Sequence, residues 1–207
     1  MIVVIDLGIG NAKAVANMVK KTGRNAILTD DPETVKKATV VIFPGVGKFD
    51  AVVEALKRSS LHETLEKKVL VDRTPYFGIC VGMQILFAGS EEGTSEGFGW
   101  VRGSVKKFDF SNMVNEKRKI PHIGWDSVKS SAEDKRSLLS LDDRFYFVHS
   151  YHAVCEDSAD IYGTTDYAYE FCSAVSHENI FGVQFHPEKS HKFGLKLFDN
   201  FFGSVNV

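Results

Sequence analysis

The first half of the chain alternates short apolar runs with stretches whose apolar residues recur at helical spacing. Residues 1–6 form an apolar run that predicts a strand, and the apolar positions of residues 12–19 predict a helix. Asp31, which precedes a proline, marks the start of another helix. Further strands are expected at 26–28, 39–43 and 76–79, and further helices at 49–56 and 61–69. This alternation predicts a parallel sheet covered by helices on both faces.

After about residue 100 the pattern changes to short β-like runs, for which antiparallel pairing is expected. These runs are 104–108, 145–149, 161–165, 173–177 and 180–185. The polar segment 130–143 predicts a surface loop, and the apolar stripe of residues 193–201 predicts a final helix packed on the sheet. The prediction is therefore an α/β fold with a mainly parallel sheet and an antiparallel β extension in its second half. A length of 207 residues favours one domain, spanning 1–207.

Composition and charge exclude several functional classes. Hydrophobic residues make up 43% of the chain and charged residues 25%, which is ordinary for a globular protein and excludes disordered and fibrous classes. The net charge is -2 and the lysine pairs are scattered, so no nucleic-acid partner is expected. Residues 1–6 have no basic leader and no apolar run reaches membrane-spanning length, so we expect a cytoplasmic protein without a membrane partner.

The cysteine content argues against cross-links. Cys80, Cys155 and Cys172 form an odd set with wide spacing and no Cys-x-x-Cys pair. This pattern favours neither a disulfide framework nor a structural zinc site, and reduced thiols are expected.

The strongest candidate for chemistry is Cys80. It lies between Gly78 and Gly82, directly after a predicted strand and before the apolar helical stretch 83–87. This arrangement is similar to the strand-turn-helix elbow that presents a nucleophile, where glycines leave room for a sharp turn. The amino end of the following helix would favour the thiolate. The alternative is that Cys80 is a buried, inert side chain.

A second candidate is the pair His186 and Glu188, at the end of the run 180–185. In extended backbone these two side chains point to the same side, so the carboxylate can orient the imidazole. Together with Cys80 they form the set that acyl transfer through a thioester requires. The alternative is a structural histidine at a strand end.

The third candidate is the loop at residues 44–47, Pro-Gly-Val-Gly, which follows a predicted strand. Its two glycines allow backbone N–H groups to turn toward a developing oxyanion, together with the N–H of Val81. The loop and Cys80 are expected at the same edge of the sheet, because open parallel sheets bind ligands beyond the carboxyl ends of their strands. An ordinary connecting loop is the alternative.

Taken in order, the segments that carry these motifs resemble class I, triad-type glutamine amidotransferases, and among them the glutaminase subunits of imidazole glycerol phosphate synthase. The segments are 8–11, 44–47 with Phe49, 78–84 with 90–93, 121–125, 147–151 and 185–190. The resemblance implies a flavodoxin-like fold and no cofactor. It also implies a reaction in which Cys80 attacks the glutamine side-chain amide, His186 moves protons and Glu188 supports the histidine.

The same resemblance implies roles for other residues. Gly47 and Val81 would stabilise the oxyanion. The residues that would hold glutamine are Gln84, Glu92, Ser150 and Tyr151. The residues that would face a partner are Asn11, Trp125, Tyr146 and Lys189. The partner that the resemblance implies is a synthase (cyclase) subunit, which would form a heterodimer with the chain and use its ammonia in making imidazole glycerol phosphate and AICAR in histidine biosynthesis.

Departures from the family pattern lie away from the triad and concern the partner. Ala12 and Lys13 stand where Leu-Arg is usual, Asp126 stands where Asn is usual, and residues 97–100 replace a more aliphatic string. A paralogous subunit that supplies a sugar amidotransferase in surface-polysaccharide synthesis is therefore an alternative. A catalytically silent regulatory subunit is another, although the set of catalytic residues is intact.

Two further alternatives are weaker. A dinucleotide site at residues 8–10 lacks its third glycine, because Lys13 stands there. A metal site built from His149, His152 and Cys155 has irregular spacing and no evident fourth ligand, so no metal is predicted.

Overall fold

The computed structural model describes residues 1–113, 118–130, 137–140 and 143–207. Its main sheet is mixed, with the strand order β2-β1-β3-β4-β12-β11-β10-β7. The parallel part consists of β1 (Ile2–Ile5), β2 (Ala26–Thr29), β3 (Val40–Gly45), β4 (Tyr76–Cys80) and β12 (Ile180–Val183). The predicted fold class, a mainly parallel sheet with an antiparallel extension, is confirmed.

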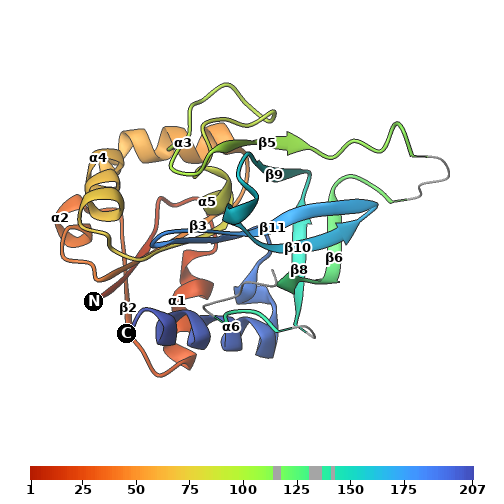
Figure 1. Cartoon of the computed structure of the whole chain (residues 1–207). Coiled ribbons are helices and arrows are strands. Elements are labelled where there is room, and N and C mark those ends of the chain that lie inside the picture. Colours follow the sequence, from red (N-terminus) through yellow and green to blue (C-terminus); the bar gives the residue numbers. More distant parts are fainter. Residues whose placement is uncertain (114–117, 131–136, 141–142) are drawn as a thin grey trace.

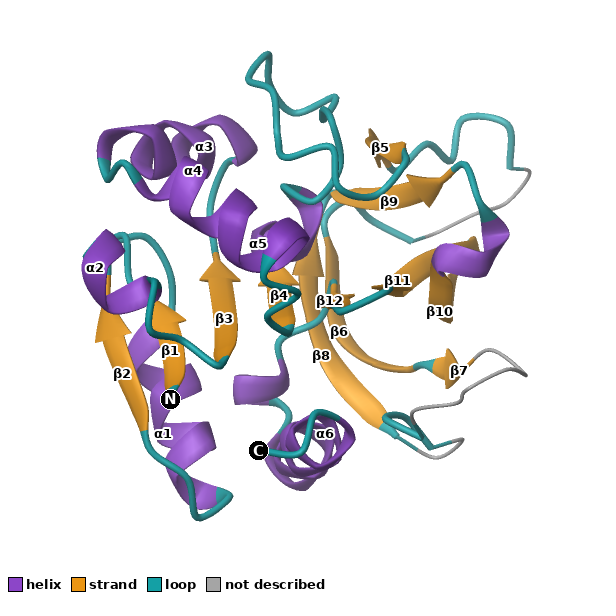
Figure 2. Ribbon diagram, turned by 60° about the vertical axis from the view of Figure 1, so that its left-hand side comes forward, coloured by secondary structure: helices purple, strands orange, loops and turns teal. Residues whose placement is uncertain are grey.

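The antiparallel extension comes from the second half of the chain. Its strands in the main sheet are β5 (Gly103–Lys107), β7 (Lys129–Ser130), β9 (Tyr151–Cys155), β10 (Ile161–Tyr167) and β11 (Tyr169–His177). A separate two-stranded sheet pairs β6 (His122–Ser127) with β8 (Arg144–His149) in antiparallel register. In Figure 2 these strands lie on the right, beside the parallel strands β2, β1, β3 and β4.

Helices cover both faces of the parallel strands. They are α1 (Ala12–Lys21), α2 (Pro32–Val35), α3 (Phe49–Arg58), α4 (Leu61–Glu66), α5 (Val81–Gln84) and α6 (His191–Ser204). A π-helical segment continues α4 over Lys67–Val71, and 3₁₀ turns occupy Ser158–Asp160 and Pro187–Lys189. Figure 1 shows α3 and α4 above the sheet and α1 and α6 below it. This two-sided cover explains why strands β1, β3 and β4 are apolar along their whole length.

The core beneath α6 is aromatic. Phe77 of β4 lies 5.1 Å from the ring of Phe181 in β12, and 5.4 Å and 4.8 Å from the rings of Phe198 and Phe201 in α6. All these rings are fully buried. The apolar stripe of the last helix is thus packed on the sheet, as its spacing predicts.

Several boundaries differ from the sequence-based expectation. Of the stretch 83–87, expected to be a helix, only residues 83 and 84 are helical, as the end of the single turn α5, and residues 85–87 form turns and bends. Strands β6 and β9 were not expected. The surface loop expected at 130–143 begins on strand β7, and its residues 131–136 and 141–142 lie outside the described residues. None of the described helices has the length and apolar character needed to cross a membrane.

Candidate active site

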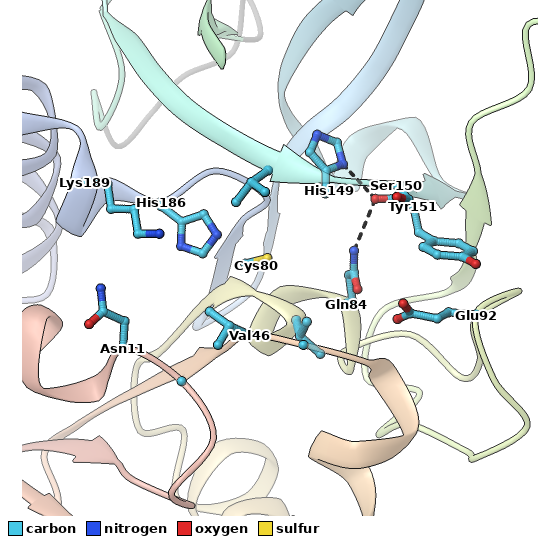
Figure 3. Close-up of a pocket in the computed structure, with 14 residues that line it drawn as sticks. Asn11, Val46, Cys80, Gln84, Glu92, His149, Ser150, Tyr151, His186 and Lys189 are labelled. Atoms are coloured by element: carbon cyan, nitrogen blue, oxygen red, sulfur yellow. Dashed lines mark hydrogen bonds between the residues drawn. The ribbon is translucent and has the colours of Figure 1, made fainter. Parts of the chain in front are cut away.

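The segments that follow β1, β3, β4 and β12 meet at one edge of the sheet, because these strands run parallel. A cavity of about 490 Å³ lies at this edge (Figure 3). It is lined by Gly10, Asn11, Val46, Gly47, Cys80, Val81, Gln84, Glu92, Val148, His149, Ser150, Tyr151, His186 and Lys189. The lining includes every predicted site residue except Glu188, Trp125 and Tyr146.

Cys80 occupies a strained turn between β4 and α5. Its φ of 54° and ψ of -111° lie where residues with a side chain are rare, which costs about 1–3 kcal/mol. The turn is held by close backbone packing, since a Cβ on Gly82 would lie 1.8 Å from the Phe43 carbonyl oxygen and one on Gly78 would lie 2.3 Å from the Gly82 oxygen. The hydroxyl of Tyr76 donates to that Gly82 oxygen at 2.9 Å. The structure therefore forms the elbow that the glycines predict.

The electrostatic part of that prediction needs correction. Because α5 is a single turn, its dipole is small and does not provide a full helix N-terminus for the Cys80 sulfur. The positive charge beside Cys80 comes instead from His186, which points toward it across the cavity (Figure 3).

His186 and Glu188 form a buried pair. His186 Nδ1 lies 2.9 Å from Glu188 Oε1, and the two side chains are 2% and 1% exposed. The geometry differs from the extended strand that was expected, because β12 ends at Val183 and Glu188 lies in a 3₁₀ turn. Since Nδ1 is bonded to Glu188, Nε2 is the nitrogen left to face the cavity and Cys80.

The segment that carries His186 is fixed to strand β8. The N–H of His186 donates to the Tyr146 carbonyl at 2.9 Å. Ser190 closes the arrangement, because its hydroxyl accepts from the Tyr146 N–H at 3.0 Å and donates to the His186 carbonyl at 2.6 Å. The imidazole is thus positioned by backbone and side-chain hydrogen bonds together.

The surroundings of His186 favour its charged form. Burial alone would lower the pKa of the imidazole, but the Cys80 sulfur and the Glu188 carboxylate outweigh burial and raise this pKa from 6.5 to about 10. The arrangement therefore suits an imidazolium beside a thiolate, the nucleophilic form of cysteine.

Two buried glutamines connect Cys80 with the antiparallel side of the cavity. Gln84 Nε2 donates to the Tyr151 carbonyl at 3.2 Å and to Gln184 Oε1 at 3.0 Å, while Gln184 Nε2 lies 3.6 Å from the Cys80 sulfur. Both amide protons of Gln84 are thus used, which leaves its Oε1 as the group available to a ligand. The sequence analysis assigned no role in the cavity to Gln184 or to His149. The position of Gln184, two residues before His186, was the signal for it.

Glu92 is held at the cavity by its contact with the start of α3. Its Oε2 accepts from the Phe49 N–H at 2.8 Å. Nearby, the Asp50 carboxylate accepts from the N–H groups of Ser95 and Thr94 at 2.9 Å and 3.1 Å, and these bonds lower the pKa of Asp50 below its usual value. The loop that carries Glu92 is therefore held to the start of α3 at Glu92 and again at residues 94 and 95.

The residues expected to face a partner gather at one rim of the cavity. Asn11 Nδ2 lies 3.4 Å from Glu188 Oε1, and the Lys189 ammonium lies 5.7 Å from the ring centroid of Tyr146. Tyr146 and Trp125 are in edge contact at 6.3 Å. Trp125 remains 36% exposed.

The two histidines and the cysteine of the alternative metal site have other contacts. His149 Nδ1 lies 2.8 Å from the Tyr151 carbonyl, and His152 contacts the Ala153 carbonyl and the Tyr169 hydroxyl at 3.1 Å and 2.9 Å. The Cys155 thiol lies 3.8 Å from that of Cys172, and both are free. Within the described ranges, no cluster of histidine, cysteine and acidic residues is arranged to hold a metal ion.

Comparison with known proteins extends over nearly the whole chain. The model of the family "Glutamine amidotransferase class-I" matches residues 3–205. The chain is 52% identical to imidazole glycerol phosphate synthase subunit HisH 2 of Methanococcus maripaludis over 202 residues, covering 97% of this chain and 98% of that protein. It is 46% identical to subunit HisH of Leptospira interrogans over 204 residues, with the same two coverages.

Solved structures agree on the fold. A crystal structure of a glutamine amidotransferase superposes with a TM-score of 0.72 at 15% identity, covering 100% of this chain and 99% of that one. The structure of PurLQS from Thermotoga maritima gives a TM-score of 0.73 at 15% identity, with coverages of 98% and 97%. At this identity the likeness concerns the fold alone.

Proposed function

This chain belongs to the class-I glutamine amidotransferase family and is an enzyme, and we propose that it is the glutaminase subunit of an imidazole glycerol phosphate synthase. In this role it releases ammonia from glutamine for a cyclase-type partner in histidine biosynthesis. The observation that carries the proposal is the strained Cys80, facing His186 and its buried partner Glu188 at one cavity.

In the first half of the proposed reaction, the Cys80 sulfur attacks the side-chain amide carbon of glutamine. The amide oxygen becomes an oxyanion, which the backbone N–H groups of Gly47 and Val81 stabilise. The φ of 99° at Gly47 supports this role for the loop, because glycine readily adopts the conformation. His186 then gives its proton to the nitrogen, the carbon–nitrogen bond breaks, and ammonia leaves a thioester on Cys80.

In the second half, His186 accepts a proton from water, and the resulting hydroxide attacks the thioester carbon. The carbon–sulfur bond breaks, so glutamate leaves and the Cys80 thiolate and His186 imidazolium are restored. Glu188 keeps the imidazole oriented throughout and stabilises its positive charge.

The α-amino and α-carboxylate groups of glutamine are held on the antiparallel side. The Glu92 carboxylate and the free Oε1 of Gln84 suit the α-ammonium group, because both accept hydrogen bonds. Backbone and hydroxyl groups of Ser150 and Tyr151 complete this pocket. The glutamine amide then reaches toward Cys80, between the two sides of the cavity.

The partner docks on the rim that contains Asn11, Trp125, Tyr146 and Lys189. Two observations support this surface: the exposed Trp125 ring, and the position of Asn11 and Lys189 in the cavity lining. Ammonia formed at Cys80 would leave on this side and enter the partner without passing through bulk water.

The test combines the chain with a cyclase-type subunit from the same organism and that subunit's nucleotide substrate. We expect Cys80→Ser to lower glutamine-dependent synthesis by about a thousand-fold or more, while synthesis from ammonium salts continues. Cys155→Ser is the matched control, because Cys155 does not line the cavity, and it should retain both activities.

Other outcomes would redirect the proposal. Loss of both activities in Cys80→Ser would indicate a structural role for this cysteine. Stimulation by a sugar amidotransferase, and none by the cyclase-type subunit, would replace the histidine pathway with surface-polysaccharide synthesis. A complex that makes product from ammonium salts but never from glutamine would indicate a silent regulatory subunit.

A further inference from the structure

A chain of polar contacts crosses the antiparallel side of the cavity and starts at the surface of strand β6. Asp126 Oδ2 lies 2.7 Å from His122 Nε2, and His122 Nδ1 lies 3.0 Å from His149 Nε2. His149 Nδ1 lies 2.8 Å from the Tyr151 carbonyl oxygen. We call these four residues the histidine relay.

The relay ends on the group that positions Gln84. The Tyr151 carbonyl accepts from Gln84 Nε2 at 3.2 Å in addition to its contact with His149. Through Gln84 and Gln184 the contacts continue to the Cys80 sulfur. The outer end is Asp126, whose side chain is 39% exposed, whereas the His122 side chain is 1% exposed. The polar path therefore joins a surface carboxylate to the nucleophile.

The relay has one proton fewer than its contacts require. A carbonyl and a carboxylate only accept, and each neutral imidazole carries one proton. The two neutral imidazoles of His122 and His149 therefore supply two protons for three contacts. A hydrogen bond at every contact requires a third proton. If His122 carries it, His122 donates both to Asp126 and to His149, and His149 can then donate to the Tyr151 carbonyl.

Without the third proton, the charged Asp126 reverses the direction of the relay. Its carboxylate takes the hydrogen bond from His122 Nε2, so His122 Nδ1 must accept from His149 Nε2. His149 Nδ1 is then unprotonated and faces the Tyr151 carbonyl, lone pair against lone pair. The contact that lacks a hydrogen bond is then the one between His149 and the Tyr151 carbonyl, at the cavity and beside Gln84.

We propose that Asp126, His122 and His149 are positioning residues for glutamine binding, and that a proton shared by His122 and Asp126 sets whether the relay holds the Tyr151 carbonyl and Gln84 in place. This inference rests on the proposed glutaminase function. The outward-pointing residues on the same strand, Ile123 and Trp125, belong to the exposed surface. Strand β6 therefore connects the partner surface with the glutamine pocket.

The relay is rigid enough for proton position to matter. The His122 ring is stacked between Phe147 at 4.7 Å and Tyr167 at 3.9 Å, with interplanar angles of 18° and 20°. Fixed in this plane, the imidazole cannot turn away from either neighbour to relieve an unfavourable contact.

The charged and titratable groups around the relay favour loss of the third proton as pH rises. Burial lowers the pKa of His122, Asp126 opposes this effect, and Arg118 adds to it, while Tyr167 and His149 face the ring. Burial also lowers the pKa of His149, the hydrogen bond with the Tyr151 carbonyl opposes this effect, and His122, His152 and His186 add to the lowering. Both imidazoles therefore favour their neutral forms as pH rises, and the third proton is held most readily by His122, whose Nε2 faces the Asp126 carboxylate at 2.7 Å.

The variant Asp126→Asn changes the number of protons in the relay but keeps the size and position of its side chains. Asn has the same size, and its amide N–H can donate to His122 Nε2, so all contacts become hydrogen bonds with neutral histidines. The quantity to follow is the glutamine KM of the wild-type complex divided by that of the variant complex. We expect this ratio to rise about five-fold between about pH 5 and about pH 9, which corresponds to the loss of one ordinary hydrogen bond. Effects of pH on Cys80 and His186 are common to both proteins and cancel in this ratio.

The matched control is Asp199→Asn, which removes a charge paired with Arg24 at 3.0 Å and lies outside the relay and its charged neighbours. It should keep the wild-type dependence of KM on pH. If Asp126→Asn also keeps that dependence, the relay does not position the glutamine pocket and the inference is wrong.

A second measurement does not depend on glutaminase activity. Imidazole ¹⁵N shifts of the isolated chain should show His149 protonated at Nδ1 at low pH and reversed at high pH in the wild type. In Asp126→Asn, His149 should keep its Nδ1 proton throughout. Identical titrations in the two proteins would overturn the relay, whereas the expected titrations in a complex without glutaminase activity would overturn the proposed function and leave the relay in place.

Discussion

The two sides of the cavity hold their functional groups by different forces. On the parallel side, Cys80 is held by backbone packing so close that Gly82 has no room for a Cβ. Toward the antiparallel side, the Gln84 side chain of α5 and the Tyr151 carbonyl of β9 are held by a network of hydrogen bonds between buried polar groups. Packing of the first kind is insensitive to pH, whereas a hydrogen-bond network depends on where each proton lies. The nucleophile is therefore fixed by shape, and the substrate pocket is adjustable.

The largest effect is expected from breaking the packed side with Gly82→Ala. A Cβ here would lie 1.8 Å from the Phe43 carbonyl oxygen, so the backbone of β3 or of the elbow must move. We expect a loss of about 3 kcal/mol or more in the free energy of unfolding, measured by urea denaturation.

The control for Gly82→Ala is Gly203→Ala in α6, where a Cβ meets no atom within 4 Å. It should stabilise the protein by about 0.5 kcal/mol, because alanine restricts the unfolded chain. Equal stability of Gly82→Ala and wild type would mean that close packing does not hold the elbow.

The next effect concerns the charged pair at the centre of the cavity. The pKa of His186 is raised from 6.5 to about 10, so its contribution to stability is complete below about pH 6.5 and is lost as pH rises toward about 10. In Cys80→Ala the sulfur no longer opposes burial, and the pKa of His186 should fall. For each unit by which the His186 pKa falls, the protein loses about 1.4 kcal/mol of stability at pH values below the lowered pKa.

The measurement for this pair is the free energy of unfolding of wild type and Cys80→Ala across the same pH range, with Cys155→Ala as control. The decline in stability should begin at lower pH in Cys80→Ala than in the other two proteins. Superimposable profiles would show that the sulfur does not stabilise the imidazolium.

The parallel side was largely predictable from the sequence. The elbow at Cys80 follows from glycines placed between an apolar run and a turn, because close backbone approach leaves few other residue types possible. The contact between His186 and Glu188 was expected, although from an extended strand and not from the 3₁₀ turn that brings it about. Assignments of roles to these residues remain predictions.

The antiparallel side was harder to predict for a physical reason. Strand β6 reverses the usual pattern, since its inward residue His122 is polar while its outward residues Ile123 and Trp125 are apolar. A hydrophobic-inside rule therefore does not find it. The partners of His149 could not be predicted either, because a hydrogen-bond network between distant segments leaves no periodic signal in the sequence.

A moderate effect is expected when the apolar outer face of β6 is truncated by Trp125→Ala. Large, partly exposed aromatic side chains often dominate binding, so the Kd for the cyclase-type partner should rise about 30-fold, or about 2 kcal/mol. Isothermal titration calorimetry of the two subunits measures this change. Val154→Ala, on an exposed apolar residue of β9, should leave the Kd unchanged. If both variants bind like wild type, the partner docks elsewhere.

The smallest effect is expected from Tyr76→Phe, which removes the hydroxyl that bonds to the Gly82 carbonyl at 2.9 Å. Burial raises the pKa of Tyr76 well above 10, so the hydroxyl remains a donor at every working pH. Its loss should cost about 1 kcal/mol of stability and lower kcat, because the elbow gains freedom. Tyr162→Phe removes a hydroxyl that accepts from the Leu138 N–H at 2.9 Å, and it should cost similar stability without changing kcat. If both variants lower kcat equally, the loss reflects general stability, and backbone packing alone fixes Cys80.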